Sequence, residues 1–295
     1  MSKKRVIALG FFDGVHVGHG ALLEKTRERA VALGVHTAAF TFDRSPREFV
    51  TGVRVPLLTG TAEREYLVTE HFGLNELIVE PFDETMMTMP WEEFLTELLV
   101  KKYGAVHLVA GHDYRFGHKN GGTSELLAEK CRELGIGCDI IPKVELDGVT
   151  VSSTYIRSLV EAGEMERAAQ FLGHPYAVRG TVCHGYGIGK AQLFPTANLA
   201  LDEHAILPKF GVYATRVHVD GKVYAGVTNV GLRPTVRTGE NVSLETYVLD
   251  FSGDLYGKEL RVEFLKFLRA EQRFASTQEL HARIEKDIAA AREVK

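Results

Sequence analysis

The stretch VIALGFFDGVHVGH, residues 6–19, decides the fold of the first half of the chain. VIALG is a short apolar run that ends in glycine, which predicts a buried strand. Apolar residues at helical spacing extend from about Gly18 to Leu33, which predicts a helix. The unpaired N–H groups and the positive dipole end of such a helix favour a phosphate group.

The alternation of strand and helix continues through the first half. Its further segments are the predicted strands HTAAFTF (36–42), ELIVEPF (76–82), VHLVAG (106–111) and CDIIPKV (138–144), and the predicted helices WEEFLTELLVKKY (91–103) and SELLAEKCRELG (124–135). This order predicts a mostly parallel, Rossmann-like sheet covered by helices, with ligands bound beyond the carboxyl ends of the strands.

The second half has a different pattern, with short strands of period-two alternation. They lie at 211–219, 222–230, 243–251 and 259–268, and a helix follows at 277–294. Regularly spaced short strands predict an antiparallel barrel or sandwich. The helical segment 156–173 separates the halves, so the expected domains are 1–173 and 174–295.

Composition limits the kinds of partner. The 295 residues carry 35 Lys plus Arg and 39 Asp plus Glu, a net charge of −4, whereas nucleic-acid binders usually have a basic excess. The three cysteines are odd in number and lack CxxC spacing, which argues against a disulfide framework or a thiolate zinc site. No stretch approaches the roughly 20 apolar residues of a membrane helix. The expectation is a cytoplasmic protein, a monomer or weak homo-oligomer, with small-molecule substrates and no nucleic-acid or membrane partner.

Two segments of the first half carry residues suited to phosphate chemistry. His16 and His19 are three residues apart, beside glycines at 10, 14 and 18 that let backbone amides approach an anion. Two imidazoles there can donate hydrogen bonds to charge that builds up on phosphorus; the alternatives are loop residues or two metal ligands. VSSTYIRSLV (151–160) is either a simple helix cap or a second phosphate cradle that includes Arg157.

Two segments of the second half also carry such residues. FPTANL (194–199) follows the glycine-bearing run GYGIGKAQL (185–193), in which Lys190 adds a positive charge. Thr196 and Asn198 offer the neutral oxygen atoms that suit Mg²⁺, although Pro, Asn and Gly also form ordinary turns. Glu245, in SLETYVLDF (243–251), is either an exposed strand residue or a general base.

These motifs, taken together and in order, resemble a known family. GFFDGVHVGH and VSSTYIR resemble the HxGH nucleotidyltransferases, and the match is closer to the prokaryotic bifunctional riboflavin kinase/FAD synthetases. GHDYRFG (111–117), FPTANL and SLETYVLDFSGDLYGKELRVEF also resemble segments of that family, so the resemblance covers nearly the whole chain. It implies an N-terminal domain that joins FMN to ATP to form FAD and a flavokinase barrel that converts riboflavin to FMN.

The resemblance also implies a role for each site residue. His16 and His19 would contact the ATP phosphates, and Glu245 would be the general base for the riboflavin 5′-hydroxyl. ATP or its phosphates would be bound by Gly10, Phe11, Asp13, Gly18, Ser153, Thr154, Arg157, Gly189, Lys190, Thr196 and Asn198, and the flavin by Asp113, Phe116, Arg233 and Arg273. Thr196 and Asn198 would hold Mg²⁺, with ATP as co-substrate and riboflavin, FMN and FAD as substrates and products.

Two departures from the family pattern leave alternatives open. The family commonly reads TFDPHP where this chain has TFDRSP (41–46), so Arg44 and Ser45 replace Pro and His. The family's RGR and LGF align with IGK (188–190) and QLF (192–194), which puts Leu193 in the place of a glycine. One alternative is a riboflavin kinase with an impaired adenylyltransferase domain, and another is a non-catalytic flavin- or nucleotide-binding regulator.

Overall fold

A computed structural model of the chain describes residues 3–183, 194–201, 204–233 and 241–294. These residues form two compact units, Met1–Ser153 and Thr154–Lys295. The units therefore divide before the helical segment 156–173, whereas the predicted domains divide after it.

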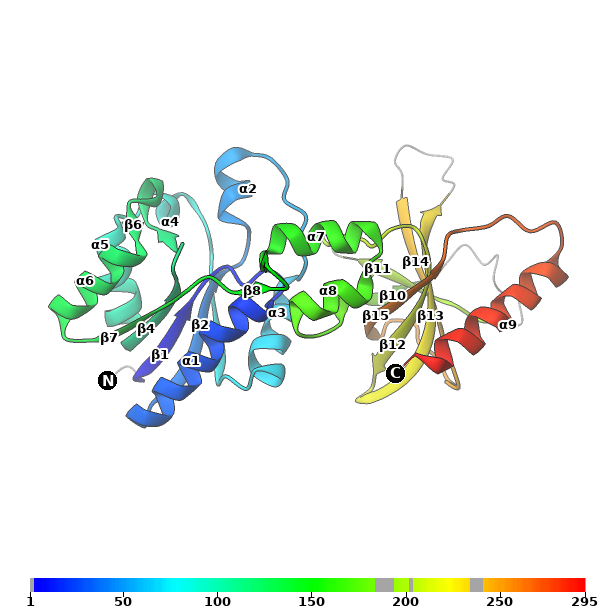
Figure 1. Ribbon diagram of the computed structural model, residues 1–295, viewed down its shortest axis with the longest axis horizontal. Coiled ribbons are helices and arrows are strands. Elements are labelled where there is room, and N and C mark those ends of the chain that lie inside the picture. The colour runs from blue at the N-terminus through cyan, green and yellow to red at the C-terminus, as the bar shows by residue number, and fades with distance from the viewer. Residues whose placement is uncertain (1–2, 184–193, 202–203, 234–240, 295) are drawn as a thin grey trace. The chain divides into compact units, whose positions relative to one another are not determined.

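The sheet of the first unit is parallel, and its strand order is β3-β2-β1-β4-β7 in the described residues (Figure 1). The strands are β1 (Arg5–Leu9), β2 (His36–Phe42), β3 (Glu76–Glu80), β4 (Ala105–Gly111) and β7 (Gly137–Ile141). All of β1 after Arg5 is buried, which explains why the segment reads as a continuous apolar run.

Helices cover both faces of this sheet, and successive residues of β1 divide between two cores. Val6 and Ala8 pack with Leu23 of α1, while Ile7 and Leu9 belong to the core on the opposite face. The helices and short strands are α1 (Val17–Leu33), α2 (Pro46–Thr51), α3 (Thr61–Tyr66), η1 (Leu67–His71), α4 (Glu84–Thr88), α5 (Trp91–Glu93), η2 (Phe94–Lys102), η3 (His118–Asn120), α6 (Ser124–Leu134), β5 (Arg115–Phe116), β6 (Gly122–Thr123), β8 (Glu145–Leu146) and β9 (Val149–Thr150).

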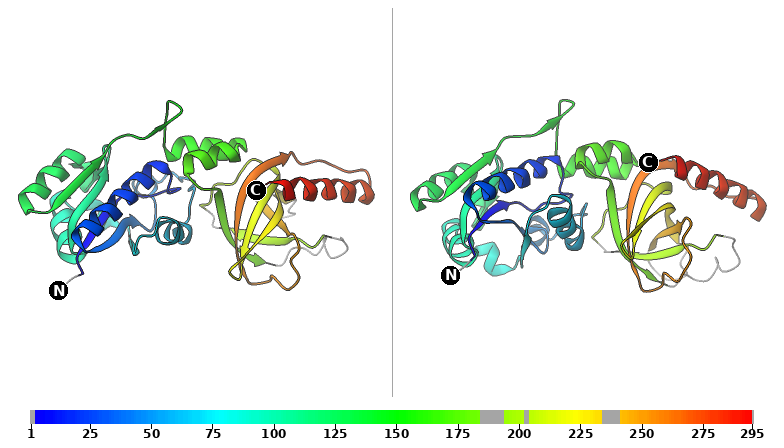
Figure 2. Two further views of the ribbon diagram at one scale, coloured as in Figure 1. Left: turned by 60° about the horizontal axis from the view of Figure 1, so that its bottom comes forward. Right: turned by 90° about the horizontal axis from the view of Figure 1, so that it is seen from below.

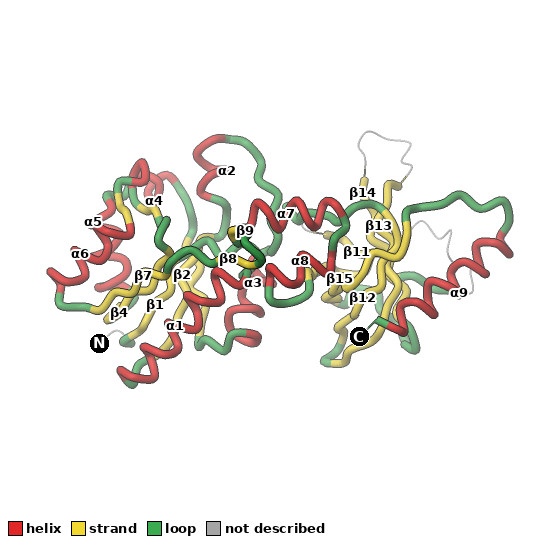
Figure 3. The backbone as a smooth tube through the Cα atoms, viewed as in Figure 1, coloured by secondary structure: helices red, strands yellow, loops and turns green. Residues whose placement is uncertain are grey.

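The second unit is built around a closed antiparallel barrel with the described strand order β10-β11-β14-β13-β12-β15 (Figure 3). Its elements are α7 (Ser153–Ala162, whose first residue closes the first unit), α8 (Met165–Leu172), β10 (Tyr176–Cys183), β11 (Ala197–Leu201), β12 (Gly211–Val219), β13 (Lys222–Arg233), β14 (Asn241–Val248), β15 (Glu259–Arg269) and α9 (Thr277–Glu293). Apolar side chains such as Val217, Leu244 and Phe264 are fully buried in the barrel.

Helix α9 contacts the outside of the barrel through its C-terminal end and projects away from the barrel at its other end (Figure 2). Ile288 and Ala291 pack there in a cluster with Val212 and Val227, so the last turns of the helix are docked. Asp287, also in this part of the helix, is buried and accepts hydrogen bonds from Arg269 of β15 at distances down to 2.7 Å. This ion pair holds the end of β15 against α9.

The predicted fold, a parallel α/β domain followed by an antiparallel barrel with a closing helix, is confirmed. Several boundaries differ. The strands predicted at 76–82 and 138–144 end at Glu80 and Ile141, and β10 and β11 were not among the predicted strands. Segment 156–173 was predicted as one helical stretch and is two helices, because Gly163 adopts a left-handed φ of 81° between them. The strand predicted at 243–251 ends at Val248, and Asp250 turns the chain with a φ of 58°. In the described part of the chain, no helix is long and apolar enough to cross a membrane.

Candidate active sites

The two predicted loops of the first unit follow neighbouring strands. GFFDGVHVGH follows β1, and GHDYRFG begins at the end of β4. After β1 the chain continues to β2 and β3 on one side of β1, and later to β4 and β7 on the other. The crevice at such a switch of direction is where open parallel sheets bind their ligands. The topology therefore brings both motifs to one ligand-binding edge.

The two histidines of the first loop lie at the start of α1. His16 is the N-cap residue, and its Nδ1 accepts a hydrogen bond from the backbone N–H of His19 at 3.2 Å. The two rings stack with centroids 3.7 Å apart and an interplanar angle of 9°. A Cβ on Gly18 would lie 3.2 Å from the His16 ring, so a side chain at this position would crowd the histidine. The pair is therefore fixed in direction before any ligand binds.

His19 is held in its neutral form. Burial and the neighbouring His16 lower the pKa of His19 well below its usual range. Its buried Nδ1 has no hydrogen-bond partner within the described residues. A neutral imidazole carries one N–H donor and one acceptor nitrogen, so His19 can offer a hydrogen bond to a phosphate without carrying a charge of its own.

The turn that presents these histidines is strained and tied down. Phe12 and Val15 have φ angles of 56° and 40°, in a region that β-branched and bulky residues avoid. Asp13 Oδ1 accepts hydrogen bonds from the backbone N–H groups of Leu58 at 2.8 Å and Thr59 at 3.1 Å. The structure thus gives the Asp13 carboxylate a part in holding the turn, and its assignment to ATP binding stays a prediction.

Sequence reasoning missed a second residue that holds this turn. Arg64 of α3 is fully buried and donates hydrogen bonds to the carbonyl oxygens of Phe11 and Phe42 at 3.0 and 3.1 Å. It also donates to the hydroxyl oxygens of Thr41 and Thr61, and its guanidinium lies over the Phe11 ring at 4.8 Å. The Arg64 guanidinium therefore holds both the backbone and the ring of Phe11, a residue predicted to bind ATP.

The third predicted segment of this site begins at the end of the first unit. The Ser153 hydroxyl donates a hydrogen bond to the Asp13 carbonyl oxygen at 2.9 Å, which brings Ser153 to the histidine turn. Thr154 and Arg157 follow in the first turns of α7 and belong to the second unit. Their grouping with His16 and His19 stays a prediction.

The two residues predicted to bind flavin in GHDYRFG differ in exposure. The Asp113 side chain is 84 % exposed, whereas Phe116 is buried in the core and stacks on Tyr114 at 5.4 Å. In the TFDRSP segment (41–46), Ser45 caps α2 by accepting a hydrogen bond from the backbone N–H of Glu48 at 3.3 Å. Arg44 beside it is exposed. The substituted serine thus has a structural use in this chain.

The barrel brings two residues of the predicted kinase site together. Asn198 of β11 lies directly opposite Glu245 of β14 in the antiparallel register. Directly opposed side chains share one face of a sheet, with Cβ atoms about 5 Å apart. Phe194, at the start of FPTANL, packs edge-on against Tyr247 at 5.5 Å and against His281 of α9 at 5.9 Å. The motif is therefore anchored between β14 and α9.

The remaining predicted kinase residues are only partly placed. Thr196 and Arg273 are exposed, and Arg233 is the last described residue of β13, opposite Asn241. Gly189, Lys190 and the substituted Leu193 lie outside the described residues.

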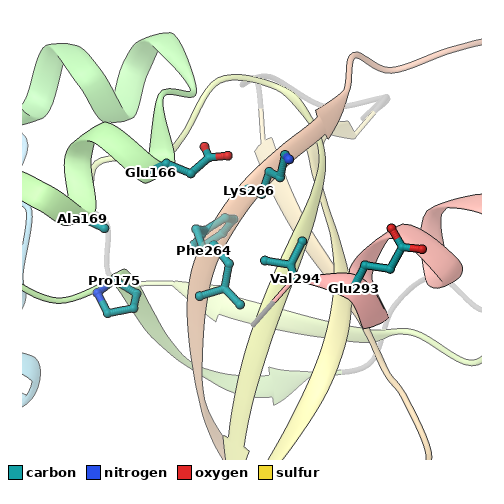
Figure 4. A pocket seen from close by; sticks show the side chains of 8 residues that line it. Glu166, Ala169, Pro175, Phe264, Lys266, Glu293 and Val294 are labelled. Carbon is teal, nitrogen blue, oxygen red and sulfur yellow. The ribbon is translucent and has the colours of Figure 1, made fainter.

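The second unit also contains an open pocket of about 390 Å³ between α8, β15 and the end of α9 (Figure 4). Among the residues that the structure describes, its lining includes Glu166, Phe264, Lys266 and Glu293 but none of the predicted site residues.

Comparison with known proteins supplies independent findings. The family described as FAD synthetase matches residues 1–155, and the family described as riboflavin kinase matches residues 172–295. Proteins named bifunctional riboflavin kinase/FMN adenylyltransferase are 38 % identical in Pseudomonas fluorescens, 35 % in Listeria monocytogenes and 36 % in Escherichia coli. These alignments cover 97, 96 and 98 % of this chain and 92, 90 and 92 % of the relatives.

A solved structure is also similar over the whole chain. It comes from Streptococcus pneumoniae, is described as a macrolide-efflux protein, and superposes with a TM-score of 0.87 at 29 % sequence identity. The match covers 100 % of this chain and 96 % of that one.

Proposed function

The chain belongs to the bifunctional riboflavin kinase/FMN adenylyltransferases, and we propose that its two reactions use the two groups of residues described above. The resemblance predicted from the motifs is thereby confirmed, and with it both activities: phosphorylation of riboflavin by ATP to FMN, and adenylylation of FMN to FAD. Neither alternative, the impaired adenylyltransferase or the non-catalytic regulator, has support in the comparisons.

For FAD formation, the proposal places the reaction at the turn between β1 and α1. An oxygen of the FMN phosphate attacks the α-phosphorus of ATP, and the bond to the leaving pyrophosphate breaks. No protein nucleophile is needed, so catalysis consists of alignment and charge stabilisation. His16 and His19 would donate hydrogen bonds to the phosphates, and Gly10 and Gly18 would let backbone N–H groups approach the phosphates closely. Ser153, Thr154 and Arg157 would hold the same phosphates from another side.

For FMN formation, Glu245 would remove the proton of the riboflavin 5′-hydroxyl as its oxygen attacks the γ-phosphorus of ATP, and ADP leaves. The single observation that carries this assignment is the pairing of Glu245 with Asn198 across β14 and β11. It puts a carboxylate beside the amide of the PTAN motif, as a base next to bound phosphates would require.

The donor atoms of this segment fit a magnesium ion. Oxygen atoms are the ligands that this hard cation prefers, and Thr196 supplies a hydroxyl oxygen and Asn198 an amide oxygen. Thr196 and Asn198 are the proposed ligands. Bound Mg²⁺ would neutralise charge on the ATP phosphates.

We also keep as proposals the functional domains 1–173 and 174–295, a cytoplasmic location and a monomeric or weakly associated state.

Two separate assays, one for each reaction, test the residue assignments. Purified protein receives either riboflavin with ATP and Mg²⁺, or FMN with ATP and Mg²⁺, and the products are followed by chromatography. Glu245→Gln is expected to lower FMN formation by at least about a hundredfold and to leave FAD formation from supplied FMN unchanged. His16→Ala combined with His19→Ala should give the reverse pattern. A variant that lowers the other reaction, or neither, refutes the assignment.

A further inference from the structure

A third residue extends the row formed by Asn198 and Glu245. On the other side of β14, Glu245 lies directly opposite Asn229 of β13. The three side chains therefore lie on one face of neighbouring strands, Asn198 and Asn229 on either side of Glu245. A carboxylate is thus flanked on both sides by an amide.

This face is the outer face of the barrel. Leu244 and Thr246, which flank Glu245 along β14, are fully buried and point to the opposite side. Val227, which shares its face with Asn229, packs in the outer cluster that contains Ala291 of α9. The row thus lies beside the helix-covered part of the barrel.

The segment between β15 and α9 contacts this row through Glu271. Asn229 Nδ2 donates a hydrogen bond to Glu271 Oε1 at 3.2 Å. Because a carboxylate can only accept, this contact requires the NH₂ group of Asn229 to face Glu271. The Oδ1 atom of Asn229 is then directed away from Glu271 and is available as an acceptor.

Gly231 makes the approach of Glu271 feasible. A Cβ at this position would lie 2.2 Å from Glu271 Oε1 and 3.3 Å from Asn229 Nδ2. Any side chain on residue 231 would therefore displace the Glu271 carboxylate. The absence of a side chain here allows Glu271 to reach Asn229.

We propose that Asn229, oriented by Glu271, is a positioning residue of the riboflavin kinase reaction. Its amide oxygen accepts a hydrogen bond from the hydroxyl-bearing chain of riboflavin and thereby directs the 5′-hydroxyl toward Glu245. The proposal rests on the role of Glu245 proposed above. An alcohol chain with several hydroxyls has many conformations, so an oriented acceptor next to the base raises the fraction of bound substrate that is ready to react.

Three single variants interrupt this arrangement in different ways. Asn229→Ala removes the acceptor, Glu271→Ala removes its orientation, and Gly231→Ala displaces the carboxylate while leaving both polar groups in the chain. Each is expected to lower kcat/KM for riboflavin by about tenfold, the effect of losing one hydrogen bond of about 1.4 kcal/mol. Formation of FAD from supplied FMN should stay unchanged, which controls for the amount of intact first unit, and an unchanged circular dichroism melting curve controls for folding of the barrel.

Two further variants distinguish an orienting role of Glu271 from a purely structural one. Asn229→Ala combined with Glu271→Ala should be no worse than Asn229→Ala alone, because Glu271 acts through Asn229. Glu271→Gln should stay within about threefold of the parent protein, because its amide oxygen still accepts the hydrogen bond. The exposed Glu285 on α9, changed to alanine, is the matched control and should have no effect.

The outcomes distinguish the two proposals. If Glu245→Gln keeps its kinase activity, the proposed site itself is wrong. If Glu245→Gln loses activity while the Asn229, Glu271 and Gly231 variants keep theirs, only the positioning role is overturned. Additive losses in the double variant, or a Glu271→Gln variant as slow as Glu271→Ala, also overturn it.

Discussion

At the scale of single residues, Arg64 shows how a buried charge supports a site that it does not enter. Its hydrogen-bond acceptors are uncharged oxygens at the ends of β1 and β2 and at the start of α3. Burial lowers the pKa of Arg64, while the nearby carboxylates of Asp13 and Asp43 oppose this shift. The guanidinium therefore links three loops that a shorter or apolar side chain would release.

Replacement of Arg64 by methionine is expected to slow FAD formation selectively. The carbonyl oxygens of Phe11 and Phe42 would lose their buried donor, at a cost of about 2–4 kcal/mol of stability in the first unit. A shift of the histidine turn by about 1 Å would lower kcat/KM for FMN on the order of a hundredfold. The assay with FMN and ATP measures the loss of FAD formation, and riboflavin phosphorylation is the control. Arg64→Lys should lie between the parent and Arg64→Met, and equal loss of both activities would contradict the expectation.

Arg64 and Glu271 also show what the sequence could not reveal. Arg64 contacts Phe11 across 53 residues of chain, and Glu271 contacts Asn229 across 42. No local pattern marks either residue, because their partners come from separate elements. The position of His16 and His19 at the start of α1 was predictable because the strand, the turn and the helix that place them are continuous in the sequence. Their catalytic role stays a prediction. Phe116 was predicted at a flavin pocket, yet its burial depends on Trp91 and Phe94 from another segment.

At the scale of elements, a polar cluster joins α1 to the edge of the sheet. Asp139 of β7 accepts hydrogen bonds from Arg29 of α1 at 2.6 and 2.9 Å, and its Oδ2 lies 2.7 Å from Nε2 of His107 on β4. The hydrogen bonds from Arg29 lower the pKa of Asp139 to about 2, with His107 contributing in the same direction. The carboxylate thus stabilises the fold while it is ionised.

The sign of this pKa shift predicts a loss of stability in acid. The unfolded carboxyl group has a pKa near 3.9, so its contribution is complete above about pH 4 and is lost as the pH falls toward about 2. Asp139→Asn should lower the urea midpoint of the first unit at pH 7. Its midpoint should also fall less than that of the parent between pH 5 and pH 3. Parallel curves for the two proteins over this range would contradict the assigned role.

Regular elements were predictable to the extent that their pattern is local. The apolar runs of β1 and β4 and the alternation of β12 and β13 gave their positions within a few residues. The split between α7 and α8 was missed, since Gly163 sits inside an otherwise helical pattern and only its left-handed backbone ends the helix. The strand order depends on pairing between distant segments, and no local pattern predicted it. The alternation of the strands left barrel and sandwich open, and only the family resemblance implied a barrel.

At the scale of the whole molecule, tryptophan fluorescence can follow the unfolding of one of the two units. The single tryptophan, Trp91, lies in the first unit and packs edge-on against Phe116 at 6.2 Å. Its fluorescence therefore follows the unfolding of the first unit, whereas circular dichroism follows both units. Two compact units with separate cores are expected to unfold in separate transitions.

Matched core substitutions test whether the units are stabilised separately. Leu108 and Phe264 are both fully buried, one in the sheet core of the first unit and the other in the barrel. Leu108→Val and Phe264→Leu should each cost about 1–3 kcal/mol, which shifts the affected transition by a few degrees. Tryptophan fluorescence should detect the shift for Leu108→Val and remain at the parent temperature for Phe264→Leu, for which circular dichroism should move alone. If both variants shift the Trp91 transition equally, the two units unfold together. A destabilising substitution in one unit would then also unfold the other, and neither reaction could serve as the control for the other.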